Sequence, residues 1–100
     1  MSIVLIGGHD RMHELYRSMC RTLGHSLKVY THMPARLEKC IGCPGGIVIF
    51  TSTVSHSMVT VAVKTAKKKN IPFVKSHSSS MDALEVAIIA LAREGCTQGR

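Results

Sequence analysis

The sequence predicts a single α/β domain of the Rossmann-like or flavodoxin-like class, with a four-stranded parallel sheet between two helical layers. Three observations lead to this class. A chain of 100 residues, 45% of them hydrophobic, can build one core but not two. Short apolar runs alternate with segments of helical periodicity. The connections between them are short, as in right-handed crossovers between parallel strands. We expect the strand order 2-1-3-4, a domain at 1–95 and a frayed tail at 96–100.

The first strand and the first helix are predicted from residues 2–24. Ser2–Ile6 is an uninterrupted apolar run that ends at two glycines, which is typical of a strand buried on both faces. Asp10 is suited to cap the helix that follows, and Gly24 to end it in a left-handed conformation. The apolar positions of this helix recur at steps of three and four and are Met12, Leu15, Tyr16, Met19 and Leu23.

The rest of the chain repeats the alternation of strand and helix. Further strands are expected at 25–32, 46–50 and 71–75, and further helices at 35–41, 57–69 and 81–94. Pro34 suits the start of the short second helix, and Gly42 its end. Asn70 ends the third helix, and Pro72 is tolerated near the start of the last strand.

The last helix is apolar around most of its circumference. One stripe consists of Met81, Leu84, Ile88 and Leu91, and its neighbours Val86, Ala87, Ile89, Ala90 and Ala92 are apolar too. Such a helix is expected to be buried on two sides, and in a domain this small the second side belongs to another copy of the chain. We therefore expect a symmetric homodimer through the last helix. The alternative is an alanine-rich helix that is partly exposed.

A polar segment that carries histidine follows each predicted strand. In open parallel sheets, ligands bind beyond the carboxyl ends of the strands, where the strand order reverses. His9, His56 and His77 are therefore expected at one edge, with His13 one helical turn beyond His9. The alternative for each histidine is a loop residue that caps a helix or bonds a backbone carbonyl.

Three kinds of chemistry suit such an edge. A catalytic nucleophile or base has the least support, because no Gly-x-Ser-x-Gly segment is present and only Asp10 and Asp82 lie nearby to orient a base. Binding of an anion or nucleotide by the glycine, serine, threonine and histidine loops is the second possibility. Against it, Gly7-Gly8-His9 matches neither a Walker loop nor Gly-x-Gly-x-x-Gly.

Ligation of haem iron, or of another transition metal, by histidine is the third possibility and the one we favour. His56 and His9 are the preferred iron ligands, followed by His77 and His13. Flexible methionines and the cations Arg11 and Lys75 could contact the macrocycle and its propionates. The residues expected to contact the cofactor are His9, Arg11, Met12, His13, Thr51, Ser52, Thr53, Ser55, His56, Met58, His77 and Ser78. We expect carriage, sensing or electron transfer rather than catalytic turnover.

The Cys40-Ile-Gly-Cys43 pair provides an alternative metal or redox site. Without a second pair, a zinc ribbon or an iron–sulfur cluster is incomplete within one chain, so Cys43 is only a second choice as a metal ligand. The pair can equally be two small apolar residues around a turn. Because no targeting or membrane-spanning segment is visible, we expect the chain in the cytoplasm with its thiols reduced.

The composition argues against two other classes of function. The net charge is +7, but Lys64, Lys67, Lys68 and Lys69 fall on one polar helix face that is expected to be solvated, so nucleic-acid binding is not favoured. Two Tyr, two Phe and no Trp do not make a stacking platform for single strands. Six scattered acidic residues make a two-carboxylate hydrolase unexpected.

Three segments at the predicted edge resemble a known family. They are Gly7-Gly8-His9-Asp10-Arg11-Met12, Thr51-Ser52-Thr53-Val54-Ser55-His56 and Ser76-His77-Ser78-Ser79-Ser80. With nearly the whole of 2–92, they are similar to the small bacterial proteins known as domain-of-unknown-function family 2325. The resemblance implies a Rossmann-like α/β domain in a bacterial cytosol with no assigned enzyme activity, and haem binding through histidine in some relatives. The Cys40–Cys43 pair does not belong to the resemblance.

Overall fold

The structure, a computed structural model, describes residues 2–32 and 36–94. A four-stranded parallel sheet lies at its centre in the order β2-β1-β3-β4, which confirms the predicted fold class and topology. The strands are β1 (Ser2–Ile6), β2 (Ser26–Tyr30), β3 (Gly46–Phe50) and β4 (Phe73–Ser76). The central strands β1 and β3 are almost wholly buried, because helices cover both faces of the sheet.

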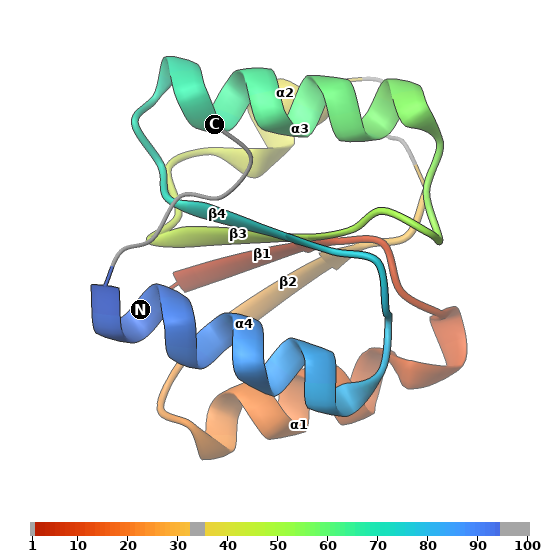
Figure 1. Ribbon diagram of the computed structural model, residues 1–100, viewed down its shortest axis with the longest axis vertical. Coiled ribbons are helices and arrows are strands. Elements are labelled where there is room, and N and C mark those ends of the chain that lie inside the picture. The colour runs from red at the N-terminus through yellow and green to blue at the C-terminus, as the bar shows by residue number, and fades with distance from the viewer. Residues whose placement is uncertain (1, 33–35, 95–100) are drawn as a thin grey trace.

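The helices form one layer on each face of the sheet (Figure 1). One layer contains α1 (His13–Thr22), preceded by the short 3-10 helix η1 (Asp10–Met12), and α4 (Met81–Glu94). The opposite layer contains α2 (Leu37–Ile41) and α3 (His56–Lys68). Among the described residues, none of these helices combines the length and the apolar character needed to cross a membrane.

Alternate residues of the buried strands divide the core into two halves. Ile3 and Leu5 of β1 pack toward α1 and α4, where Tyr16 meets Phe50 edge to face with ring centroids 5.9 Å apart. Val4 and Ile6 pack toward α2 and α3. Each fully buried aliphatic side chain contributes about 1.5–3 kcal/mol relative to exposure, so both layers are firmly attached to the sheet.

The predicted boundaries hold for β1, β3 and α4, whereas β4 begins two residues later than predicted. The amide of Ile71 donates to the carbonyl of Ala66, and Asn70 has a φ of 55°, so Ile71 closes the end of α3 instead of opening β4. The predicted positions of Pro34 and of the tail at 96–100 lie outside the described residues.

Two expectations about α1 are wrong. Asp10 does not cap the helix, because its carboxylate points to the end of β2 and the chain from Asp10 to Met12 forms η1 instead. Leu15 is not part of the buried stripe, since 53% of it is exposed, and Cys20 is buried together with Tyr16. The remaining stripe residues Met12, Met19 and Leu23 do pack against the core.

The apolar stripe of α4 belongs to the chain's own core. Leu84, Ile88 and Leu91 are buried there, and Met81 packs against them. Leu84, Ile88 and Leu91 are therefore not at the surface, whereas Met81 is half-buried. The large apolar side chains left exposed on the described part of this helix are Val86, which is 67% exposed, and Ile89, which is 41% exposed.

Candidate functional site

Two glycines at the end of β1 allow the chain to turn in a space that admits no side chain. Gly7 and Gly8 have φ angles of 108° and 92°, values that other residues rarely adopt. A Cβ on Gly7 would lie 2.6 Å from the Thr53 Oγ1 atom, and one on Gly8 would lie 2.7 Å from the Tyr16 Cε2 atom. Both the backbone conformation and the space therefore require glycine.

This turn presents His9 on a backbone held by distant parts of the chain. The buried Gly8 amide donates to the Thr53 hydroxyl at 2.7 Å, and Thr53 in turn donates to the Phe50 carbonyl at 3.1 Å. The His9 imidazole is exposed, and its Nε2 atom lies 3.3 Å from the Ser79 hydroxyl. The exposed His9 imidazole therefore lies on a turn that is held by contacts with the loops after β3 and β4.

Tyr16 packs against the turn at Gly8 and links it to another loop. Its hydroxyl donates to the Ser79 carbonyl at 2.8 Å, which joins α1 to the loop before α4. Burial raises the pKa of Tyr16, an effect that a hydrogen bond with the His9 backbone opposes. Tyr16 is therefore a protonated donor at neutral pH and links the loop of His9 to that of Ser79.

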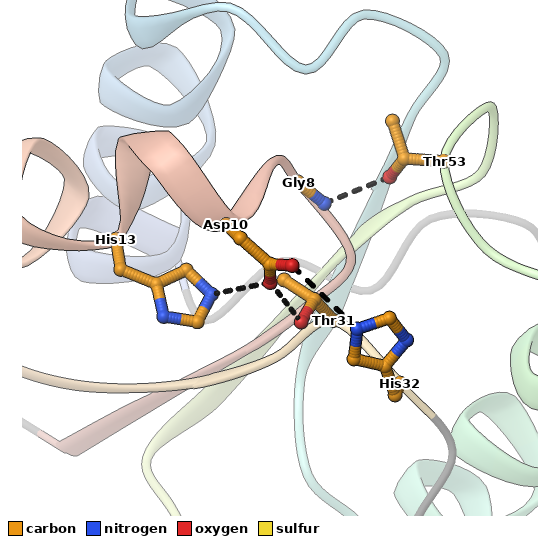
Figure 2. A network of polar contacts seen from close by, with 6 residues as sticks. All are labelled: Gly8, Asp10, His13, Thr31, His32 and Thr53. Carbon is orange, nitrogen blue, oxygen red and sulfur yellow. Dashed lines mark hydrogen bonds and ion pairs between the residues drawn. The ribbon is translucent and has the colours of Figure 1, made fainter.

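A second polar cluster is centred on Asp10 (Figure 2). The Thr31 hydroxyl donates to its Oδ1 atom at 2.6 Å, and the Nε2 atoms of His13 and His32 lie 3.7 and 3.6 Å from its two carboxylate oxygens. The imidazoles stand on either side of the carboxylate. The Thr31 hydrogen bond is the largest cause of the lowered pKa of Asp10, and the charges of His32 and His13 also lower it.

The hydroxyl groups after β3 hold the β4 loop in place. Thr51 bonds the Ser76 carbonyl through its amide at 2.9 Å and less closely through its hydroxyl, and the Ser52 hydroxyl donates to the His77 carbonyl at 2.5 Å. These contacts leave the His77 imidazole exposed. These hydroxyls donate to the chain itself and can still accept, so the role of Thr51, Ser52 and Thr53 as ligand contacts stays a prediction.

Other predicted contact residues are dispersed. Ser55 caps α3 by accepting the Met58 amide at 3.2 Å, and exposed His56 follows it at the start of that helix. Met58 is only 2% exposed and belongs to the core beneath α3, so it is not available to a ligand at the edge. Ser78 bonds Ser80 through its hydroxyl at 3.2 Å.

Three predicted residues lie close to His9 in the chain. Arg11 is exposed, and Met12 is half-buried against the core. The Nε2 atom of His13 is buried and has no hydrogen-bond partner, since the Asp10 carboxylate is too distant for one. Among the described residues, no group of three or more His, Cys, Asp or Glu side chains is arranged to hold a metal ion.

The cysteine pair lies at the opposite edge of the sheet. Cys40 is near the end of α2, and exposed Cys43 comes just before Gly45, whose amide donates to the Ser2 carbonyl at the start of β1. Cys43 therefore cannot join the histidines at the carboxyl edge. Both thiols, and the buried thiol of Cys20, are free.

The predicted contact set left out four residues at the edge: Tyr16 and Ser79, which anchor the His9 turn, and Thr31 and His32, which meet Asp10. Ser79 and His32 were expected near this edge, but without a role. The position of Thr31 and His32 directly after the strand beside β1 was the available signal, because parallel neighbours end at the same edge.

Comparison with known proteins identifies a family for the chain but no ligand. Neither the curated proteins nor the solved structures contain a match to the chain. One family model matches residues 2–91, almost all of the described domain and all three edge segments. The chain therefore belongs to the family described as uncharacterized protein conserved in bacteria (DUF2325).

Proposed function

We propose that this protein binds haem through His9 at the carboxyl edge of the sheet and acts in haem carriage, sensing or electron transfer. The observation that carries the proposal is an exposed imidazole directly after two glycines in left-handed conformations. Glycine adopts these angles without strain, and here they place His9 on a turn that contacts Thr53 and Tyr16.

The residues around His9 fit the chemistry of haem. Imidazole nitrogen is a common axial ligand of haem iron. A groove of about 340 Å³ between β4 and α4 reaches Ser76, the last residue of β4 and three residues before Ser79, which His9 contacts. Its charged lining residues are Lys75, a cation suited to a propionate, and Asp82. Its apolar lining consists of Val74, Ala83, Val86, Ala87 and Ala90. Bound haem would supply an iron centre that accepts and donates electrons or binds a small gas.

His9 is a better candidate than the other predicted ligands. His56 begins α3, in the helical layer opposite α1 and α4, and is therefore separated from the apolar groove by the sheet. The Nε2 atom of His13 is buried against Asp10. His77 is exposed in the same loop as Ser79 and is the second candidate.

We also propose that two copies of the chain associate through the outer surface of α4. An open groove leaves one face of a flat macrocycle uncovered. Val86 lines this groove, and Val86 and Ile89 are exposed apolar side chains of α4. A second copy would cover both. The cytoplasmic location that we expect agrees with free Cys20, Cys40 and Cys43.

Titration with ferric haem tests the proposal. The parent protein should give a saturable shift of the Soret band, and His9→Ala should weaken binding more than about tenfold, or about 1.4 kcal/mol. His56→Ala is the matched control, since it removes an exposed imidazole from the opposite layer and should bind like the parent. Binding by His9→Ala equal to that of the parent, or a shift that never saturates, contradicts the proposal.

The two alternative functions have less support. An anion in the same loops would need amides and hydroxyls that are already used, such as the Gly8 amide and the Thr53 hydroxyl. A metal or redox role for Cys40 and Cys43 has only their separate position and free thiols in its favour. Stabilisation by phosphate that is lost in His9→Ala, with no binding of haem, would favour the first alternative, and metal content lost in Cys43→Ser the second.

A further inference from the structure

A basic groove lies at the amino edge of the sheet, away from the histidine edge. It has a volume of about 500 Å³ and is lined by Arg17, Arg21, Gly24, His25, Ser26 and Leu27, from the second half of α1 to the start of β2. Its size is within the range of sites for small molecules. We propose that this groove binds a small molecule that carries one or more phosphate groups.

The charge of the groove favours an anion. Arg17 and Arg21 are one helical turn apart, so both exposed side chains lie on the same side of α1. Within the part of the chain that the structure describes, neither arginine is in an ion pair, and no acidic residue lines the groove. The nearest acid along the helix, Glu14, lies one turn before Arg17, outside the lining. Two guanidinium groups offer the paired donors that phosphate oxygens accept.

The turn at Gly24, which follows the arginines at the end of α1, is held by hydrogen bonds and has open space beside it. Gly24 has a φ of 86°. The turn is held by two hydrogen bonds of 2.9 Å, which the Gly24 amide donates to the Arg21 carbonyl and the His25 amide donates to the Cys20 carbonyl. A Cβ on Gly24 would meet no atom within 4 Å, so the space above the turn is free. Ser26 adds an exposed hydroxyl.

Two further lining residues suit a small organic phosphate. Half-buried Leu27 offers an apolar surface for the part of the ligand that carries no charge. Half-buried His25, whose pKa burial lowers, is a further polar residue of the lining. The groove therefore combines charge, polar groups and an apolar wall.

The distribution of charge distinguishes a small ligand from a nucleic acid. Lys64 and Lys67 are on α3, in the helical layer on the opposite face of the sheet from α1 (Figure 1). They therefore do not extend the groove into a continuous stripe of the kind that a nucleic-acid backbone follows. A compact phosphate-bearing molecule can bind through contacts with the residues of the groove alone.

Calorimetric titration with inorganic pyrophosphate and with a nucleoside triphosphate, at constant ionic strength, tests the proposal. Both should bind saturably, and the double variant Arg17→Gln/Arg21→Gln should weaken binding more than about tenfold. Lys64→Gln/Lys67→Gln removes the same charge from the opposite layer and should change binding by less than about twofold. The sites are exposed, and thermal melting shows whether each variant is folded.

Three results would overturn the proposal. They are the absence of saturable binding by both phosphate compounds, equal weakening by the two double variants, and binding of a short DNA duplex that is tighter than pyrophosphate and equally sensitive to both. His9→Ala should leave pyrophosphate binding unchanged, because His9 is at the other edge. The phosphate groove and the haem proposal can therefore fail independently.

Discussion

At the residue scale, Gly7 and Gly8 determine where the His9 imidazole stands. Their positive φ angles direct the chain across the end of the sheet, and the side chains of Thr53 and Tyr16 occupy the space where a Cβ would be. A substitution here costs free energy twice, through backbone strain and through displacement of a packed neighbour.

Gly8→Ala compared with Gly24→Ala separates these two costs. Both glycines have a positive φ, but a Cβ on Gly8 would lie 2.7 Å from Tyr16 while one on Gly24 would meet nothing. Strain alone costs about 1–3 kcal/mol, so Gly24→Ala should lose that much and Gly8→Ala clearly more. Urea unfolding at constant m-value measures both losses. Equal losses would mean that the Tyr16 contact relaxes without cost.

The carboxylate of Asp10 should make stability depend on acid pH. Because its pKa in the folded protein is below its ordinary value of 3.8, the ionised group stabilises the fold above that pH. The contribution is lost as the pH falls through the folded pKa. The stability advantage of the parent over Asp10→Asn should therefore shrink between about pH 5 and pH 2.5. Glu14→Gln, which leaves the Thr31 contact intact, is the control, and an advantage that does not change with pH contradicts this account.

At the scale of elements, the carboxyl edge is a set of loops that bond one another. The β1 loop bonds the β3 loop through Gly8 and Thr53, and the β3 loop bonds the β4 loop through Ser52 and His77. Tyr16 completes the connection from α1 to the loop before α4. A substitution in one of these loops should therefore alter the position of the His9 imidazole.

Thr53→Val tests this coupling. The substitution keeps the shape of the side chain but leaves the buried Gly8 amide without its acceptor, which should cost about 1–3 kcal/mol of unfolding free energy. Thr53→Ser retains the hydroxyl and should cost less than about 1 kcal/mol. The valine variant should also bind haem more weakly than the serine variant. Similar stability of the two variants would show that the hydroxyl contributes little.

The elements could be predicted from the sequence wherever burial dictates composition. Strands such as β1 and β3 must be apolar throughout because both faces are covered, so their limits are visible in the sequence. The start of β4 was missed because Ile71 is apolar and buried for another reason, as the residue that closes α3. The local sequence pattern does not distinguish an isoleucine that closes a helix from one that begins a strand.

The sequence predicts which edge of the sheet carries the candidate site, but not how the side chains there are arranged. Chain order and the rule for parallel sheets place His9, His56 and His77 after strand ends. Which helical layer each histidine adjoins, and that Asp10 faces Thr31 across neighbouring strands, depend on side-chain direction and register. Those are properties of the folded chain that a single sequence does not display.

At the scale of the whole molecule, the two proposed sites occupy opposite ends of one rigid sheet, and α4 presents an apolar outer surface. One side of this helix is core, as the burial of Leu84 and Ile88 shows, and among the described residues its large exposed apolar side chains are Val86 and Ile89. Such a limited surface favours an association that β4 and its groove help to form.

The homodimer makes a simple prediction in the analytical ultracentrifuge. The parent should sediment as a dimer, and Val86→Lys/Ile89→Lys as a monomer, because two charges would have to be buried in the interface. Leu15→Lys places a charge on a comparably exposed apolar residue of α1 and should remain a dimer. A monomeric parent, or dissociation caused by Leu15→Lys as well, would refute the proposed surface.

The position of Tyr16 has an optical consequence. The chain has no tryptophan and only two tyrosines, so its intrinsic ultraviolet emission comes from Tyr16 and Tyr30. In a Tyr30→Phe variant all of that emission would come from a ring that packs on Phe50 and whose hydroxyl bonds the Ser79 carbonyl, beside His9. The protein therefore contains its own fluorophore at the histidine edge, and a chromophore bound there should quench it.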